Sequence, residues 1–550
     1  MGHISRYETE VLIIGGGATG TSIMRDCALR GIKCMLLDKN DIASGTTGRN
    51  HGLLHSGARY AVTDSESAHE CIQENKILKK IASHCVDKTD GLFITLPEDD
   101  LSFQSTFIHA CSSVGIDTQK LTPEEALKLE PNVNPSLLGA VKVPDGTLDP
   151  FRLCASNVLD AKKYGAQIFT YSVVQSFIRA GERIIGASCL NVRTNEKFEI
   201  FAHEVINAAG IWGKNICQYA DLDVQMFPAK GSLLVLEHRI NELVINRCRK
   251  PADADILVPG DSISLIGTTS EEIDYSEIDS LRVTDQEVNI LIAEGAKLAP
   301  ILEKTRILRA YAGVRPLVDV SGGNGRNISR GIVLLDHAQR DGLTGLTSIL
   351  GGKLMTCRLM AEMTTDVVAK KLGNNSPCTT HLQPLPGSVE TADKQPQKKT
   401  ALTSKAAAYR HGEKAVQLFD QSAKGKSIVC ECEMVSVGEI EYAIKKLDVT
   451  NLVDLRRRTR LGMGSCQGEL CTYRASGLFC EYGQCSGHDS SKLLIHFLEE
   501  RWKGIKPVLF DDALREAEFT YWIYEGLFGA ADVTLLGTAQ NDEKKEYYEI

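Results

Sequence analysis

The chain has 550 residues, of which 43% are hydrophobic and 24% charged, and it carries a formal net charge of −9 at pH 7. This length exceeds one ordinary core and predicts two or three domains, while the acidic balance argues against nucleic acid as a partner. No run reaches the roughly 18 apolar residues of a membrane span, and scattered cysteines without an N-terminal apolar segment favour a reducing cytoplasm.

The stretch from Glu10 to Asp38 is typical of a strand, a glycine turn, a helix and a second strand. The turn carries G-x-G-x-x-G, whose glycines allow a tight turn, close approach of a pyrophosphate and close packing of helix on sheet. The following helix offers free N–H groups to phosphate, and Asp38 can accept a hydrogen bond from a ribose hydroxyl. The pattern predicts a dinucleotide site, the alternative being a structural glycine turn. The residues assigned to this site are Gly15, Gly17, Ala18, Thr19, Gly20, Asp38 and Lys39.

A polar, glycine-rich loop follows, from Gly45 to Tyr60. It is too long for a simple turn, which predicts backbone wrapped around a ligand, with Gly45, Thr46 and Thr47 next to the cofactor. His51 and His55 lie in this loop. Either could transfer a proton, although loop histidines are often only hydrogen-bonded structural groups.

Further along, residues 65–140 are expected to be largely helical, and Asp149 and Pro150 suit the cap and first residue of a helix. Residues 205–213 run from a strand into a glycine turn and predict a return to the nucleotide sheet. The section after Phe227 alternates apolar and polar residues and favours an antiparallel sheet beside a substrate cavity. Arg315 and Arg330 lie on turns, where guanidinium groups could bind a substrate phosphate or simply be solvated.

A second glycine turn, at Gly351 and Gly352, precedes a long helix. The positive end of that helix could stabilise negative charge on a reduced flavin, with Lys353 close by, or the lysine could merely be exposed. The residues assigned to cofactor binding here are Gly351, Gly352, Lys353, Leu354 and Thr356.

Residues 374–427 are polar and proline-containing and are interpreted as a linker. Beyond them lie Cys430 and Cys432 and, 33 residues later, Cys466 and Cys471. Two tight cysteine pairs can ligate one metal centre, either a 2Fe-2S cluster or zinc, or can remain unligated. The arginine-rich run 455–460 could offset a negative cluster, meet an acidic partner or form a solvated helix face. The aromatic residues after Arg501 could dock a partner or pack on the rest of the chain.

The motifs of the first half resemble the FAD-dependent glycerol-3-phosphate dehydrogenases, in the Gly-Gly-Gly-Ala-Thr-Gly turn, the Gly-Thr-Thr loop and the His55-to-Tyr60 segment. The resemblance implies an α/β fold with a Rossmann-like FAD-binding domain of the glutathione-reductase or amino-acid-oxidase type and a β-rich substrate domain. It also implies catalytic roles for His55, Arg59, Arg315, Arg330 and Lys353. In aerobic relatives a histidine follows a Lys-Gly-Ser motif, whereas here Leu233 follows Ser232, so His55, His51 or a polarised water is left as the general base.

The cysteine quartet resembles the bacterioferritin-associated-ferredoxin-like domain, which holds a 2Fe-2S cluster, and the combination resembles the large FAD-bearing subunits of the anaerobic enzymes in this family. That implies oxidation of sn-glycerol 3-phosphate to dihydroxyacetone phosphate. It implies electron transfer to a quinone through a membrane-attached iron–sulfur subunit, which is reached by way of a second flavin-bearing subunit. It also implies a peripheral position on the cytoplasmic face of the bacterial inner membrane. Two rivals remain: an FAD-dependent amine or amino-acid dehydrogenase, and a flavoprotein that only relays electrons.

The predicted division of the chain has four parts. Residues 1–373 form the FAD-dependent oxidoreductase region, with FAD-binding segments at about 8–75, 140–225 and 325–373 interleaved with substrate-domain segments at about 76–139 and 226–324. Residues 374–427 form the linker, 428–485 the 2Fe-2S domain and 486–550 a C-terminal helical tail.

Overall fold

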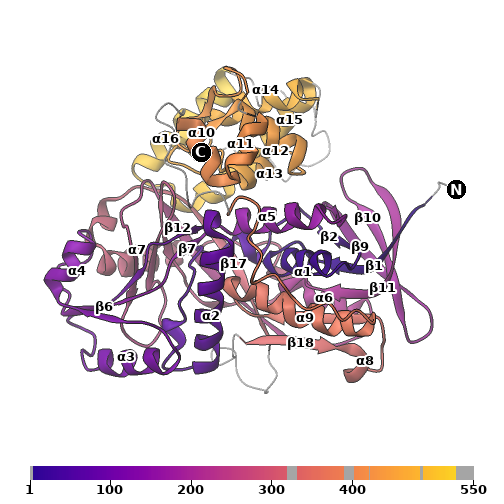
Figure 1. Ribbon diagram of the computed structural model, residues 1–550. Helices are drawn as coiled ribbons and strands as arrows, with labels where there is room; N and C mark the ends of the chain where they lie inside the picture. Colours follow the sequence, from indigo (N-terminus) through magenta and orange to yellow (C-terminus); the bar gives the residue numbers. More distant parts are fainter. Residues whose placement is uncertain (1–3, 319–330, 389–401, 420, 484–486, 528–550) are drawn as a thin grey trace.

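The computed structural model describes residues 4–318, 331–388, 402–419, 421–483 and 487–527. Three bodies are visible in Figure 1: two sheets side by side with their helices, and a helical body resting on both. The α/β fold class and the additional C-terminal domain are confirmed. In the described part of the chain, no helix is both long and apolar enough to cross a membrane.

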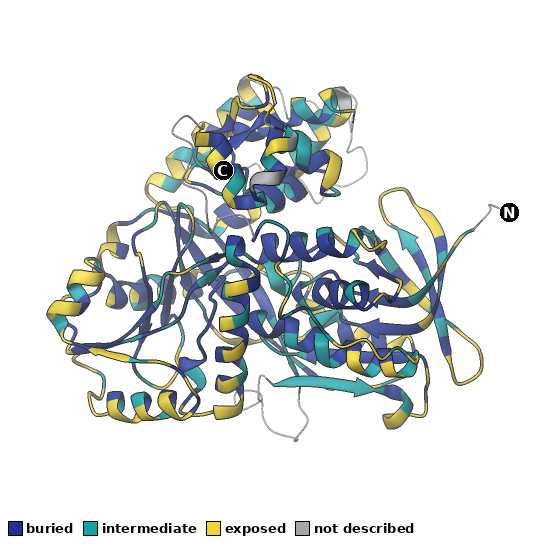
Figure 2. Ribbon diagram, in the orientation of Figure 1, coloured by how far each residue is buried: buried dark blue, intermediate teal, exposed yellow. Residues whose placement is uncertain are grey.

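The first sheet has eight strands built around β1 (Ser5–Ile14). Its side chains alternate: Val11 and Ile13 join the core under the helices, whereas Leu12 and Ile14 join the core on the opposite face. Because both faces are covered there, the second half of the strand, Val11–Ile14, is an uninterrupted and fully buried apolar run, whereas its first half is polar and partly exposed (Figure 2). The other strands are β2 (Cys34–Leu37), β8 (Gln167–Phe169), β9 (Ser172–Arg179), β10 (Ile184–Asn191), β11 (Glu196–Asn207), β18 (Ile332–Asp336) and β19 (Leu346–Gly351).

Helices α1 (Ala18–Leu29), α5 (Pro150–Lys162) and α9 (Cys357–Lys371) pack together over this sheet. α5 begins as the sequence predicts, because the Asp149 side chain accepts hydrogen bonds from the Phe151 and Arg152 N–H groups and Pro150 is the first helical residue. α2 (Ser65–Ile81) contributes to the same core and leads into the second sheet.

The second sheet has nine strands and pairs mostly antiparallel, as expected for a β-rich substrate domain. β17 (Ile307–Val318) runs along β12 (Met226–Leu236) over their whole length and brings Arg315 opposite Ala229. α7 (Asp285–Leu298) covers one face. The remaining strands are β4 (Gly91–Thr95), β5 (Gln119–Leu121), β6 (Gly139–Val143), β13 (Val244–Arg247), β14 (Ile256–Pro259), β15 (Ser264–Gly267) and β16 (Glu271–Glu272).

The third body differs in extent from the sequence-based division, because part of the predicted linker is helical. Within residues 374–427, α10 and α11 pack on the C-terminal helices, and Arg410 pairs with buried Glu439 at 2.6 Å. Residues 389–401 of that segment, and 528–550 of the predicted tail, lie outside the described residues. The helices are α10 (Leu402–His411), α11 (Glu413–Phe419), α12 (Val437–Lys446), α13 (Leu452–Thr459), α14 (Cys471–Glu481), α15 (Gly487–Ile505) and α16 (Asp512–Tyr521).

Ion pairs attach this third body to the two sheets. Buried Asp41, just after β2, pairs with Arg458 at 2.6 Å and with Arg457 at 3.2 Å. Arg460 lies 3.1 Å from Asp261 and 2.8 Å from Glu433. Part of the arginine-rich run therefore docks the domain on its own chain, rather than forming a solvated helix face.

Candidate active site and cysteine centre

A cavity of about 1580 Å³ opens between the two sheets. It is lined on one side by the carboxyl ends of β1 and β2 and on the other by β12 and β17. Gly20 and Thr356 lie behind its wall, and Arg330 lies outside the described residues. The sequence-predicted residues that line it are Gly15, Gly17, Ala18, Thr19, Asp38, Lys39, Gly45, Thr46, Thr47, His51, His55, Arg59, Arg315, Gly351, Gly352, Lys353 and Leu354.

The glycine turn leaves room for a ligand and none for side chains. Gly15 has φ +112°, and a Cβ there would lie 2.4 Å from the Ala208 carbonyl oxygen. A Cβ on Gly20 would lie 1.8 Å from the Gly15 carbonyl oxygen, so this glycine holds α1 against the turn. The Ala18 N–H donates to Thr47 Oγ1 at 3.0 Å, which ties the second loop to the start of α1. This cradle fits the pyrophosphate of FAD.

Asp38 lies beside the cradle and accepts hydrogen bonds from the Gly16 N–H at 2.6 Å and the Asn40 N–H at 2.8 Å. Burial raises the pKa of Asp38 to about 6, since a charged carboxylate is less well solvated inside the protein. The group is therefore ionised at neutral pH and is an acceptor for a ribose hydroxyl.

We expect FAD binding to weaken as the pH falls through 6. If FAD binds the ionised form of Asp38, its Kd should rise about ten-fold for each pH unit well below 6, because protonation then competes with binding. Fluorescence titration of apoprotein with FAD between pH 4.5 and 8 measures this slope. Asp38→Asn is the matched control and should bind more weakly at pH 8 with a flatter profile; a slope unchanged by the substitution would contradict the role.

Opposite the cradle, a group of polar side chains forms the second end of the site. The His55 ring lies 5.5 Å from the Tyr60 ring, edge to face, and Lys353 Nζ lies 5.0 Å from the centre of the same ring. His51 Nδ1 accepts a hydrogen bond from the Leu53 N–H at 3.2 Å. The neutral His51 ring therefore carries its proton on Nε2 and is set to donate, which leaves His55 as the stronger candidate for a base.

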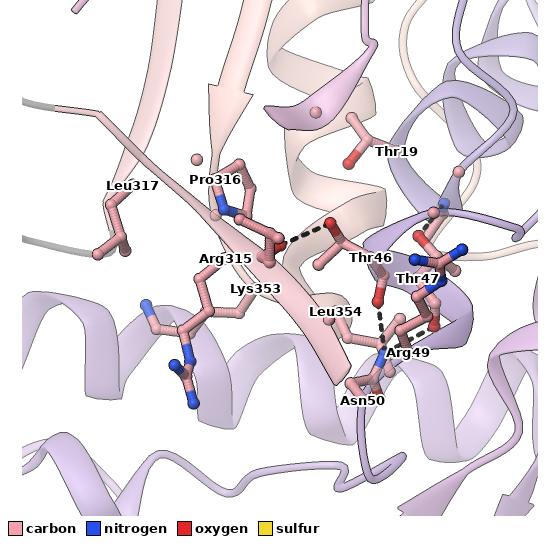
Figure 3. A pocket seen from close by; sticks show the side chains of 18 of the residues that line it. Thr19, Thr46, Thr47, Arg49, Asn50, Arg315, Pro316, Leu317, Lys353 and Leu354 are labelled. Atoms are coloured by element: carbon pink, nitrogen blue, oxygen red, sulfur yellow. Dashed lines mark hydrogen bonds between the residues drawn. The ribbon is translucent and has the colours of Figure 1, made fainter. Parts of the chain in front are cut away.

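Two arginines complete this end, and both are anchored by the backbone. Arg315 donates to the Thr269 carbonyl oxygen at 2.9 Å and contacts Thr268 Oγ1. Arg59 donates to the Ala252 carbonyl oxygen at 3.2 Å and pairs with buried Asp255 at 3.5 Å. Figure 3 shows Arg315 and Lys353 together on one side of the cavity, with Thr46 and Thr47 on the other. Fixed guanidinium groups suit a small substrate that carries a phosphate.

The Lys-Gly-Ser motif on β12 has a structural role. Lys230 Nζ lies 2.8 Å from Glu271 and 3.0 Å from Glu287, and Ser232 donates to Glu287 at 2.7 Å. Leu233, the next residue, lines the cavity. The wall therefore has an apolar side chain at the position where the motif of the aerobic relatives continues with a histidine.

Sequence reasoning missed several residues of the cavity wall. Trp212 and Asp279 were not predicted, and they hold the predicted Lys39: its Nζ lies 2.7 Å from Asp279 and 4.1 Å from the centre of the Trp212 ring, and Trp212 Nε1 donates to Asp279 at 3.0 Å. Arg49 also lines the cavity, although only its loop was assigned. These contacts join segments 67 to 240 residues apart in the chain, and no local motif marks them.

The cysteine quartet converges in the C-terminal body. Cys471 is hydrogen-bonded to both Cys430 and Cys466, and Cys432 is next to Cys466. A hydrogen bond from Cys471 lowers the pKa of Cys466 to about 5, helped by the backbone N–H groups of Gly468 and Glu469. A Cβ on Gly464 would lie 2.4 Å from Cys432 Cβ, so only glycine lets the two loops approach. The spacing of the four thiols and the close approach of their two loops suit a tetrathiolate cluster, although no three of these side chains in the described part of the chain are arranged as ligands of one ion.

Comparisons with known proteins agree with both sites. The profile of the FAD dependent oxidoreductase family matches residues 10–358, and that of the BFD-like [2Fe-2S] binding domain matches residues 428–481. The cofactors are accordingly FAD and a 2Fe-2S cluster, as predicted, and the zinc alternative is not supported.

Individual relatives span nearly the whole chain. It is 58% identical over 97% of its length to an anaerobic glycerol-3-phosphate dehydrogenase subunit of Haemophilus influenzae, covering 95% of that protein. It is 60% identical over 95% to the corresponding Escherichia coli subunit, covering 97%. The FAD-complexed glycerol-3-phosphate dehydrogenase of Bacillus halodurans superposes with a TM-score of 0.67 at 22% identity, over 92% of this chain and 96% of that one. The chain belongs to the FAD-dependent oxidoreductases, in the family of these anaerobic glycerol-3-phosphate dehydrogenase subunits.

Proposed function

We propose that the protein oxidises sn-glycerol 3-phosphate to dihydroxyacetone phosphate and passes the electrons on through its 2Fe-2S cluster. The observation that carries this proposal is that a dinucleotide cradle and a fixed basic group, Arg59, Arg315 and Lys353, share one cavity with His55. When bound, FAD supplies a two-electron hydride acceptor and the cluster a one-electron carrier. The high identity to subunits of anaerobic glycerol-3-phosphate dehydrogenases supports this choice over an amine or amino-acid dehydrogenase.

Each residue of the site has a separate role in the proposed reaction. Arg315 and Arg59 bind the phosphate of the substrate and hold its secondary alcohol near the second glycine turn. Lys353, beside the Tyr60 ring, adds positive charge close to the reacting carbon. His55 removes the hydroxyl proton as hydride leaves the carbon that bears this hydroxyl, and the burial of the His55 side chain limits its contact with bulk water.

We expect His55→Ala to slow substrate-driven flavin reduction by about 10²–10⁴-fold, the usual contribution of a general base. His51→Ala is the matched comparison and should have a smaller effect, since His51 donates rather than accepts. Anaerobic stopped-flow absorbance at saturating glycerol 3-phosphate measures both rates. The assignment fails if both variants hold FAD and reduce it at near-normal rates.

The electron acceptors are also part of the proposal. Relatives are named as one subunit of an anaerobic enzyme, which supports a multi-subunit assembly. We propose that electrons pass to a second flavin-bearing subunit, then to a membrane-attached iron–sulfur subunit, and finally to a quinone. The chain would then be peripheral, on the cytoplasmic face of the inner membrane, held there by its partner.

An anaerobic visible spectrum of the purified chain, before and after addition of glycerol 3-phosphate, tests the function. Bleaching of the flavin band and loss of cluster absorbance are expected. Both cofactors without any bleaching would favour a relay flavoprotein, and bleaching by an amino acid instead would favour the dehydrogenase rival.

A further inference from the structure

Four arginines lie in the seam between the flavin cavity and the cysteine domain, and we call them the seam arginines. Arg49 lines the cavity, Arg309 lies on β17, Arg456 on α13 and Arg501 on α15. Within the residues that the structure describes, none of the four guanidinium groups has a hydrogen bond or an ion pair. Arg501 is only 8% exposed, and the Nε atoms of Arg309 and Arg501 are buried without a partner.

The seam arginines act on one another. Burial lowers the pKa of each of the four guanidinium groups. The charge of Arg501 lowers the pKa of Arg309 further, and the charge of Arg309 lowers the pKa of Arg456. Glu500 is the one carboxylate that acts on three of them, and it is shared with Lys503 at 2.5 Å. A guanidinium group remains charged even so. Arg49 is exposed to solvent, and Arg309 and Arg456 are half-buried. Arg501 is buried, and Glu469 and Glu516 act on it without forming an ion pair, so the positive charge that lacks both solvent and a direct partner is concentrated there.

The two ends of the seam meet the two redox sites. At one end, Arg49 belongs to the glycine-rich loop beside the cofactor cavity. Tyr311, two residues after Arg309 on β17, joins the strand to this loop, because its hydroxyl donates to the Asn50 carbonyl oxygen at 2.9 Å. At the other end, α15, which carries Arg501, packs on α14, which begins at Cys471. A Cβ on Gly468 would lie 2.8 Å from the Phe497 ring, one turn before Arg501 on the same helix. The seam arginines therefore run from the flavin cavity to the cysteine quartet.

Docking of the cysteine domain on the two sheets does not explain the presence of the seam arginines. The contacts that hold the cysteine domain in place use other arginines, Arg458 to Asp41 and Arg460 to Glu433 and Asp261. In each of these pairs the arginine contacts a carboxylate. The seam arginines would be replaceable by neutral side chains if they served only to fill space.

We propose that the seam arginines raise the reduction potential of the 2Fe-2S cluster and so draw electrons from the flavin; this inference rests on the proposed function. Oxidation of one substrate molecule releases two electrons and two protons, and the cluster takes the electrons singly. Each electron adds one negative charge to the cluster without requiring a proton. A nearby cation stabilises that added charge, most strongly where it is buried as Arg501 is, because the protein interior screens charge poorly.

The test is a potentiometric titration of the purified holoprotein, following the paramagnetic signal of the reduced cluster and the flavin absorbance. Arg501→Gln removes the buried charge on α15, the helix that packs on α14, and Arg501→Lys keeps it. Arg309→Gln removes one farther away, in case Arg501→Gln loses its cluster. Arg179→Gln on β9, which pairs with exposed Asp221, is a control with the same change in charge.

We expect Arg501→Gln to lower the equilibrium constant for one-electron transfer from flavin to cluster by roughly ten-fold, a shift of about 59 mV towards more negative potential. Arg309→Gln should shift it in the same direction by less, while Arg501→Lys and Arg179→Gln should stay near the parent. Unchanged potentials in both Gln variants, with the cluster intact, would overturn this inference alone. A parent protein with no 2Fe-2S signal would overturn it together with the proposed electron exit.

Discussion

Arg315→Ala is expected to lower kcat/KM for glycerol 3-phosphate by about 100- to 1000-fold. Truncating one side of a desolvated, hydrogen-bonded charge pair typically costs about 2–5 kcal/mol, and the substrate phosphate would lose that partner. The loss should appear mainly in KM, because the proposed role of Arg315 is to bind a part of the substrate that does not react. Steady-state kinetics with a soluble dye as electron acceptor measures both parameters.

Two controls make this prediction specific. Arg179→Ala removes an arginine that pairs with exposed Asp221 and should leave kcat/KM unchanged. FAD content, measured from the flavin spectrum, should stay normal in Arg315→Ala, since the dinucleotide cradle is built from other strands. Glycerol without its phosphate should be turned over equally poorly by parent and variant. A parent-like KM for glycerol 3-phosphate in Arg315→Ala would place the phosphate elsewhere.

Cys466→Ser is expected to abolish the 2Fe-2S cluster and to leave substrate-driven flavin reduction intact. Serine is a poor ligand for this iron site, and the pKa of Cys466, about 5, marks a thiol already poised to bind as thiolate. The iron content and the visible cluster bands should fall to background. Stopped-flow bleaching of the flavin by glycerol 3-phosphate should continue at near the parent rate, while electron delivery beyond the flavin stops.

Cys480→Ser provides the comparison, since Cys480 lies on α14, like Cys471, but outside the quartet. It should retain iron and the full electron path. If Cys466→Ser kept its cluster, another residue would have to be the fourth ligand. If it lost FAD as well, the two cofactor sites would depend on each other for folding.

The features that could be predicted from sequence are those with local steric or chemical demands. The Gly15-to-Gly20 turn excludes side chains by its own backbone, and Asp149 with Pro150 starts α5 from within one turn. The cysteine spacing likewise marks one centre. Such patterns are readable because the residues that need one another are close in the chain.

The missed features depend on contacts between distant segments. Lys39 meets Asp279 across two sheets, and the seam arginines come from β17, α13 and α15 as well as the cofactor loop. The segment 402–419 looked like linker because its helices are weakly amphipathic alone, yet Arg410 finds its partner in Glu439.

The position of Asp41 ties cofactor loading to assembly of the chain. It follows Asp38 by three residues, so one short loop carries both the ribose acceptor and the buried partner of Arg458. A substitution in this loop that moves Asp38 would therefore also disturb an anchor of the cysteine domain, so the cofactor site and the docking of the electron-exporting domain depend on one short segment.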